Sequence, residues 1–210
     1  MSDNKNSGVH LLNFSKEDSN EKKFTVIVSG LGRSGTTMIA KMLTAGNVFM
    51  GVNKTSVIHE DMTLANLIEN QQEEKLIKFI NNRDTVHSIW GFKRPLITYK
   101  ADFYENFIRN PRYIIVYRDP LAVSMRNMKS IGLSFSAAMD TYFAQAETIR
   151  NFVNKNRKPI LLMSYEKILL DKEYAAQSLA NFCGIDKSKI GAMTGNIIPN
   201  ETMYLQQTSA

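Results

Sequence analysis

Four short apolar runs recur along the chain, each with the length and composition of a buried β-strand. They cover residues 24–28 (FTVIV), 89–93 (IWGFK), 113–117 (YIIVY) and 160–164 (ILLMS). Apolar runs of this length that do not alternate with polar residues are typical of parallel strands covered on both faces. Each run therefore predicts a strand in the interior of the protein.

The segments between these runs have the spacing of helices. A helix is expected from residue 38 after the first strand, a helix or a helix pair over residues 62–82, the clearest helix over 134–153, and a last helix near 174–183. Asp119 and Pro120 predict a helix start, as an N-cap and a first helical residue. The alternation of strand and helix predicts an α/β fold. We expect a parallel sheet flanked by helices on both faces, with ligands at the carboxyl ends of the strands.

Length and composition favour a single domain of ordinary content. The chain has 210 residues, of which 43% are hydrophobic and 22% charged. Residues 1–22 are rich in polar side chains and are expected to form a flexible arm, followed by one domain over residues 23–210. No apolar run reaches the roughly 18 residues that a membrane span needs, and we expect a cytoplasmic protein. The single cysteine, Cys183, leaves no internal disulfide.

The basic charge changes this picture little. The net charge is +6, but the Lys and Arg residues are dispersed and form no dense basic helix. This distribution argues against nucleic-acid binding as the main role and suits attraction of small polyanions.

A loop that can bind phosphate follows the first predicted strand. Residues 29–37 read SGLGRSGTT, with Gly30 and Gly35 where the G-x-x-x-x-G-K-[ST] loop has its glycines. Thr36 stands in place of the lysine that grips β- and γ-phosphates, and Arg33 supplies a cation earlier in the loop. The N–H groups of residues 32–37 would converge on an anion at the start of the helix. The loop therefore predicts a nucleotide whose reactive group is carried on a single 5′-phosphate.

Three motifs in this order resemble the sulfotransferase superfamily that uses 3′-phosphoadenosine 5′-phosphosulfate (PAPS). They are LGRSGTT at 31–37, WGFKRP at 90–95 and YIIVYRDPLAVS at 113–124. The chain most resembles short bacterial sulfotransferases, which share Met50-Gly51, Glu60-Asp61 and Ser164-Tyr165-Glu166. The resemblance extends from about residue 24 to about residue 186, and it implies the architecture of P-loop nucleoside-triphosphate hydrolases.

The resemblance implies a donor site built from the loop and the third motif. Arg33 would bind the 5′-phosphosulfate, and the loop residues around it would contribute, namely Gly32, Ser34, Gly35, Thr36 and Thr37. Arg118 would bind the 3′-phosphate, which distinguishes this donor from ATP, because a guanidinium grips phosphate through two donors. The alternative is that Arg118 pairs with Asp119 or a helix end. The family usually has a serine as a second 3′-phosphate ligand; Arg126 stands at that position here and Ser124 is close by, so both are candidates.

The resemblance also implies catalytic roles for Lys93 and Glu60. Lys93 would stabilise charge on the oxygen that bridges sulfur and phosphorus as that bond breaks. Glu60 fits the glutamate that serves as general base in some members, with His59 and Asp61 as competitors. The alternative for the competitors is that Asp61 caps the following helix and that His59 is exposed.

The resulting hypothesis is sulfuryl transfer from PAPS to an acceptor hydroxyl, with adenosine 3′,5′-bisphosphate (PAP) as the product and no metal. Arg33, Lys93 and Glu60 would carry the catalysis. The acceptor would be a small molecule or a glycan, and no motif identifies it or the oligomeric state. Two other classes stay open, a magnesium-dependent P-loop kinase or NTPase and a nucleotide-binding module without catalysis.

Overall fold

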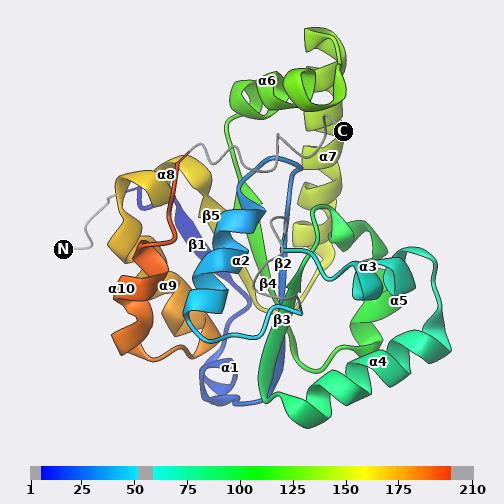
Figure 1. Ribbon diagram of the computed structural model, residues 1–210, viewed down its shortest axis with the longest axis vertical. Coiled ribbons are helices and arrows are strands. Elements are labelled where there is room, and N and C mark those ends of the chain that lie inside the picture. The colour runs from blue at the N-terminus through cyan, green and yellow to red at the C-terminus, as the bar shows by residue number, and fades with distance from the viewer. Residues whose placement is uncertain (1–5, 52–58, 200–210) are drawn as a thin grey trace.

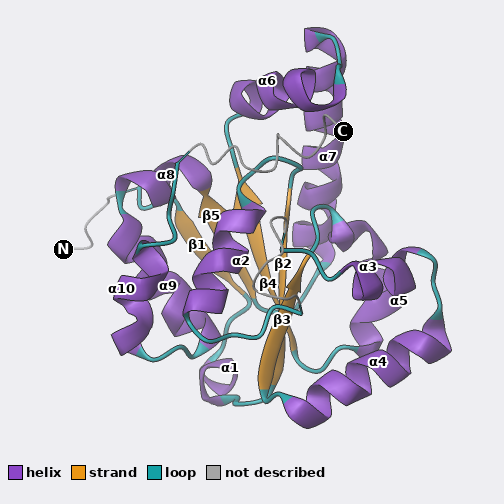
Figure 2. Ribbon diagram, viewed as in Figure 1, coloured by secondary structure: helices purple, strands orange, loops and turns teal. Residues whose placement is uncertain are grey.

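The computed structural model describes residues 6–51 and 59–199, which form a mostly parallel β-sheet between two layers of helices (Figures 1 and 2). The sheet has the order β1-β5-β4-β2-β3. Its strands are β1 (Val9–Leu12), β2 (Phe24–Gly30), β3 (Ile89–Lys93), β4 (Pro111–Tyr117) and β5 (Ile160–Ser164). The last four pair in parallel, whereas β1 pairs antiparallel with β5. The expected α/β fold is confirmed, with this one antiparallel strand at the edge.

Helices cover both faces of the sheet, so β2 to β5 have few exposed positions. One layer holds α2 (Thr36–Ala45), α8 (Tyr165–Leu170), α9 (Lys172–Cys183) and α10 (Ile190–Thr194). The other layer holds α3 (Met62–Glu69), α4 (Glu73–Val86), α5 (Ala101–Tyr104), α6 (Pro120–Ile131) and α7 (Phe135–Lys155). On β2, Val26 and Val28 pack against the first layer and Ile27 against the second. Both sides of the strand are therefore apolar, which explains its continuous hydrophobic run.

Two predicted helical regions take a definite form. The stretch 62–82 is a helix pair, and the chain turns between α3 and α4 at Gln71, whose φ is 51°. Asp119 caps α6 by accepting a hydrogen bond from the N–H of Ala122 at 2.8 Å, and Pro120 is the first helical residue. The helix start predicted from these two residues is confirmed.

Much of the N-terminal segment expected to be a flexible arm is built into the fold instead. β1 lies along the edge of β5, and α1 (Lys16–Asn20) follows it. Buried Arg112 of β4 holds this segment, because its guanidinium donates to the carbonyl oxygens of Asp18 and Phe182. The polar composition misled the prediction because an edge strand need not be apolar, and His10 and Leu11 of β1 are exposed. Residues 1–5 of the expected arm lie outside the described residues.

The sheet topology places a site at the carboxyl end of β2. β3 lies on one side of β2 and β4 on the other, so the chain order reverses at this strand. Loops that leave neighbouring strands in opposite directions open a crevice at such a point, which is where ligands bind in open α/β sheets.

Candidate functional site

The loop between β2 and α2 has the backbone shape of a phosphate-binding turn. Arg33 has a φ of 66°, and Gly35, the N-cap of α2, has a φ of 101° and makes no side-chain cap hydrogen bond. A Cβ at Gly35 would come within 2.4 Å of the Tyr165 ring, and one at Gly30 within 2.5 Å of the Val116 carbonyl oxygen. Both glycines are therefore required by close approach as well as by backbone conformation. A left-handed arginine is uncommon, and such strain is typical of ligand-binding turns.

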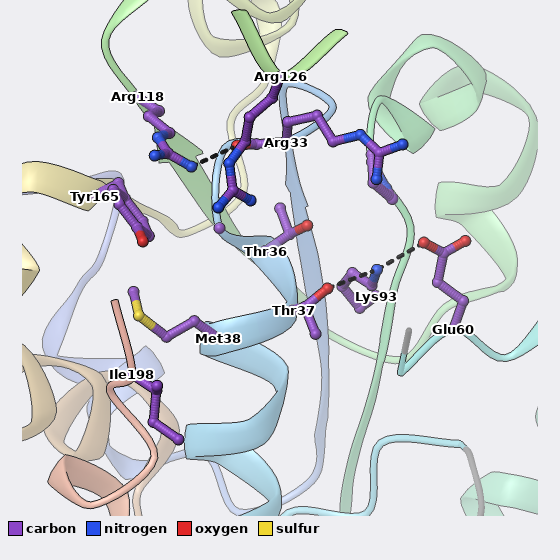
Figure 3. A pocket seen from close by; sticks show the side chains of 12 residues that line it. Arg33, Thr36, Thr37, Met38, Glu60, Lys93, Arg118, Arg126, Tyr165 and Ile198 are labelled. Carbon is purple, nitrogen blue, oxygen red and sulfur yellow. Dashed lines mark hydrogen bonds and ion pairs between the residues drawn. The ribbon is translucent and has the colours of Figure 1, made fainter. Parts of the chain in front are cut away.

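This loop forms the floor of a pocket that carries an excess of positive charge (Figure 3). Four cationic side chains and one carboxylate line it. The lining residues are Arg33, Gly35, Thr36, Thr37, Met38, Glu60, Lys93, Pro95, Arg118, Arg126, Tyr165 and Ile198. The pocket thus brings together most of the residues that the sequence singles out, from separate segments of the chain.

Arg118 is held in place by contacts to its side chain and its backbone. Its Nη1 donates to the Arg33 carbonyl oxygen at 3.2 Å, and its guanidinium carbon lies 4.2 Å from the centre of the Tyr165 ring. The Tyr142 hydroxyl donates to the Arg118 carbonyl oxygen at 3.1 Å. The buried Nε of Arg118 has no hydrogen-bond partner within residues 6–51 and 59–199. A buried donor of this kind is costly unless a ligand satisfies it.

Asp119 is engaged elsewhere than with Arg118. Its carboxylate caps α6, and its N–H donates to Glu166 Oε1 at 3.0 Å. The Ser164 hydroxyl donates to the other oxygen of Glu166 at 3.4 Å. The Ser-Tyr-Glu motif at the end of β5 therefore supports the adjacent end of β4, which Arg118 directly follows.

The structure separates the two candidates for a second 3′-phosphate ligand. Ser124 is fully buried, and its hydroxyl donates to Met139 Sδ at 3.1 Å, so it does not line the pocket. Arg126 points into the pocket from α6, beside Arg118 (Figure 3). Burial lowers the pKa of Arg126, and repulsion from Arg118 and Arg33 lowers it further. An anion bound between these guanidinium groups would relieve that repulsion.

Lys93 brings an ammonium group to the loop from the neighbouring strand. Its side chain is 3% exposed, and its Nζ donates to Glu60 Oε1 at 2.6 Å and to Thr37 Oγ1 at 3.4 Å. Burial lowers the pKa of Lys93, an effect that Glu60 opposes and the nearby Arg94 and Arg33 reinforce. The loop lacks its own lysine, but the end of β3 supplies one beside Thr37.

Of the three candidates for a general base, only Glu60 lines the pocket. Asp61 caps α3 through the N–H of Leu64 at 3.1 Å and pairs with Arg83 at 3.0 Å. Burial raises the pKa of Asp61, against the effects of the Leu64 N–H and Arg83. The expectation of an exposed His59 is wrong: this residue has a φ of 51° and is 7% exposed, because the turn directs it inward.

Arg94 links Glu60 to helix α3. Its Nη1 lies 2.5 Å from Glu60 Oε2, its Nη2 lies 2.7 Å from Glu69 Oε1, and its Nε donates to the same Glu69 oxygen at 2.8 Å. The hydrogen bonds to Glu60 and Glu69 outweigh burial and raise the pKa of Arg94. The sequence analysis gave Glu69 no role, because nothing in the motif around Lys93 indicates which residue of α3 Arg94 contacts.

Tyr165 is a pocket residue that the sequence analysis mentioned only as part of a motif. Its ring packs against both Gly35 and Arg118. The sequence could have indicated this role, because Tyr165 directly follows β5 and Arg118 directly follows the neighbouring strand β4. The carboxyl ends of parallel strands meet at one edge of the sheet.

Comparison with known proteins identifies the family and the fold. The model of the sulfotransferase family matches residues 59–189. The sulfotransferase domain of the Synechococcus PCC 7002 olefin synthase aligns with a TM-score of 0.57 and 16% identity over 89% of this chain and 84% of that one. The sulfotransferase domain from the curacin biosynthetic pathway gives 0.55 and 17% over 80% and 76%. Retinol dehydratase, solved with retinol and PAP, gives 0.51 and 14% over 87% and 68%.

A search of curated protein sequences returned no match. Within the described part of the chain, no helix combines the length and the apolar character needed to cross a bilayer. At these identities the structural neighbours establish the fold, while the family model covers more than half of the sequence. The chain belongs to the sulfotransferase family.

Proposed function

We propose that the protein transfers the sulfuryl group of PAPS to an acceptor hydroxyl and releases PAP. One observation supports this most strongly, namely the grouping of four cationic side chains with a single carboxylate at the start of α2. Arg33 comes from the loop, Lys93 from β3, Arg118 from the end of β4 and Arg126 from α6. Such an array suits a ligand with several phosphate or sulfate groups more than one with a single charge.

The residues present fit a donor that is phosphorylated at both the 5′ and 3′ positions. The N–H groups at the start of α2, with Gly32, Arg33, Thr36 and Thr37, would hold the 5′ end, since a helix N-terminus attracts anions. Ser34 lies in the same turn; its buried hydroxyl has no hydrogen-bond partner among the residues described. Arg118 and Arg126 would hold the 3′-phosphate, in place of the usual arginine and serine. Retinol dehydratase, which shares the fold, was crystallised with PAP.

The chemistry follows from where Glu60 and Lys93 lie. Glu60 accepts the proton of the acceptor hydroxyl as that oxygen bonds to sulfur and becomes more acidic. Lys93 stabilises negative charge on the phosphate oxygen that sulfur leaves, through an ammonium held at the loop by Thr37. Arg33, which lines the same pocket, stabilises the sulfuryl oxygens. One S–O bond forms, one breaks, and the proton ends on the Glu60 carboxylate, so atoms and charges balance.

The acceptor would be a hydroxyl-bearing small molecule or a glycan. A panel of phenols, aliphatic alcohols and saccharides, assayed with sulfur-labelled PAPS, would identify the class. Retinol, named with retinol dehydratase, is one member to include.

Binding measurements test the donor assignment without knowledge of the acceptor. Isothermal titration calorimetry would compare PAP, AMP and ATP with magnesium, both with the wild type and with Arg118→Lys. We expect PAP to bind at least about tenfold more tightly than AMP, because charge-assisted bonds to the 3′-phosphate add about 1.5–3 kcal/mol. Arg118→Lys should reduce PAP affinity while AMP affinity stays nearly constant.

Each alternative predicts a different result. Tighter binding of magnesium-ATP than of PAP would support a kinase or NTPase and contradict the proposal. Tight PAP binding with no sulfuryl transfer to any acceptor, water included, would leave a nucleotide-binding module.

A further inference from the structure

An alternating chain of charges extends from the pocket to helix α3. It consists of Lys93, Glu60, Arg94 and Glu69, and each neighbouring pair is in contact. The Lys93–Glu60 and Glu60–Arg94 separations are 2.6 and 2.5 Å, and Arg94–Glu69 is 2.7 Å. Lys93 and Glu60 face the pocket, whereas Arg94 and Glu69 do not line it. The chain therefore has an inner pair at the proposed reaction centre and an outer pair behind it.

The geometry of Arg94 divides its contacts between two carboxylates. Nε and Nη2 both meet Glu69 Oε1, which fixes the plane of the guanidinium against α3. Nη1 is then directed at Glu60 Oε2. A planar group with donors in a fixed fork can hold two partners in a defined geometry, whereas a lysine ammonium cannot.

Glu60 depends on such an external hold. It is positioned by a turn rather than by a helix or strand, since it lies between His59, with a φ of 51°, and Asp61, the N-cap of α3. The pairing of Asp61 with Arg83 fixes the backbone on one side. The Glu60 side chain itself has three rotatable bonds, and its two oxygens are held by Lys93 and Arg94. Loss of either partner would free the carboxylate to swing.

We propose that Arg94 and Glu69 are positioning residues for sulfuryl transfer, a role that rests on the proposed function of Glu60. Glu69 anchors the guanidinium of Arg94, and Arg94 holds one oxygen of Glu60 so that the carboxylate faces the acceptor hydroxyl. A carboxylate oxygen can accept more than one hydrogen bond, so the pairing leaves Glu60 able to take the proton. Arg94 also shares the negative charge of Glu60, so that Lys93 is not neutralised by Glu60 alone and can act on the donor.

The test uses PAPS with water in place of the acceptor, measured as sulfate release, together with PAP titration. The variants are Arg94→Ala, Arg94→Lys, Glu69→Gln and Glu69→Ala, with Arg150→Ala as a control. Arg150 belongs to an exposed ion pair with Glu147, far along α7. Thermal melting of each variant separates a loss of folding from a loss of positioning. Glu69→Gln removes one charge and should fold even where Arg94→Ala, which removes the partner of two carboxylates, does not.

We expect the outer pair to affect turnover and not donor binding. Arg94→Ala should lower kcat by about 100-fold, the size of effect that misplacement of a catalytic group by about 1 Å produces. Glu69→Ala should lower it by about tenfold and Glu69→Gln by less, since the amide oxygen can still accept from Arg94. Arg94→Lys should recover little of the loss. The affinity for PAP should change less than about threefold in all of them.

A double-mutant cycle supplies the readout that a merely structural role would not give. In a Glu60→Gln background, Arg94→Ala should change kcat by less than about twofold, because the residue acts through Glu60. Equal effects of Arg94→Ala in both backgrounds would overturn the inference. So would a large loss of PAP affinity, which would make Arg94 a donor ligand. Failure of the wild type to bind PAP, or to transfer the sulfuryl group to any acceptor, water included, would instead overturn the proposed function.

Discussion

Replacement of Gly35 by alanine tests whether the phosphate loop and the Tyr165–Arg118 contact form one unit. Gly35 has a φ of 101°, and a Cβ there would lie 2.4 Å from Cδ2 and 2.9 Å from Cε2 of Tyr165. The methyl group therefore meets two difficulties, an unfavourable backbone and an aromatic ring that must move. The ring also supports the guanidinium of Arg118, so the consequence extends to the proposed donor site.

A matched control separates the expected loss of stability into a part from the backbone conformation and a part from overpacking. Gly184 also has a positive φ, 61°, but a Cβ there would meet nothing within 4 Å. Gly184→Ala should cost about 1 kcal/mol, since the left-handed conformation costs about 1–2 kcal/mol and the stiffer unfolded chain offsets part of it. Gly35→Ala adds overpacking, typically about 1–3 kcal/mol, so its total should be about 3 kcal/mol.

Two measurements check this prediction. Guanidinium unfolding gives the free energy of each variant, provided that the m-values agree with that of the wild type. Calorimetric titration with PAP should show about a tenfold weaker affinity for Gly35→Ala, because displacement of Tyr165 removes a cation–π contact of about 1–2 kcal/mol from Arg118. Gly184→Ala should bind PAP as the wild type does. Equal destabilisation by the two substitutions, or unchanged PAP affinity in Gly35→Ala, would refute the reasoning.

Three further predictions concern single side chains. Arg126→Ala should weaken PAP binding by more than about tenfold and Ser124→Ala by less than about twofold, since only Arg126 lines the pocket; similar losses in calorimetry would contradict this. Burial lowers the pKa of Lys93 from its ordinary value of 10.5. Between the lowered pKa and 10.5 the unfolded chain therefore binds more protons than the folded chain, and the free energy of unfolding should rise with pH through that window. Lys93→Met should flatten this rise in unfolding experiments between pH 7 and about 10.5, and an unchanged slope would count against it. Burial raises the pKa of the Cys183 thiol to about 12, so a chromogenic disulfide reagent at pH 8 should react only as the protein unfolds; rapid reaction of the native protein would disprove the burial.

The four parallel strands could be predicted from the sequence because burial on both faces requires apolar residues throughout each strand. β2, β3, β4 and β5 are covered on both faces, which leaves continuous apolar runs that can be recognised without knowledge of their neighbours. β1 could not be found in this way. Its pairing with β5 requires backbone hydrogen bonds and little burial, so its composition resembles that of a polar segment.

The candidate site divides in the same manner. Lys93 and Arg118 could be placed at one edge of the sheet because Lys93 ends one apolar run, Arg118 directly follows another, and parallel strands align their carboxyl ends. Their roles came from the family resemblance. The choice between Ser124 and Arg126 depended on which face of α6 is turned toward the pocket. Asp119 and Pro120 determine where the helix begins, but its packing against α7 determines which face is turned inward. The contact between Arg94 and Glu69 joins β3 to α3 across 25 positions in the chain, and no local pattern encodes it.

The edge strand β1 has a practical consequence for where the chain can be cut. β1 is short and half exposed, yet it pairs with β5 from Ile160 to Met163, and the N–H of Ser164 donates to the Gly8 carbonyl oxygen. A chain shortened to begin at residue 23 would leave that row of amide and carbonyl groups open to solvent. Open rims of this kind recruit strands from other molecules. Such a shortened chain would therefore self-associate and precipitate, although every residue of the pocket would be retained.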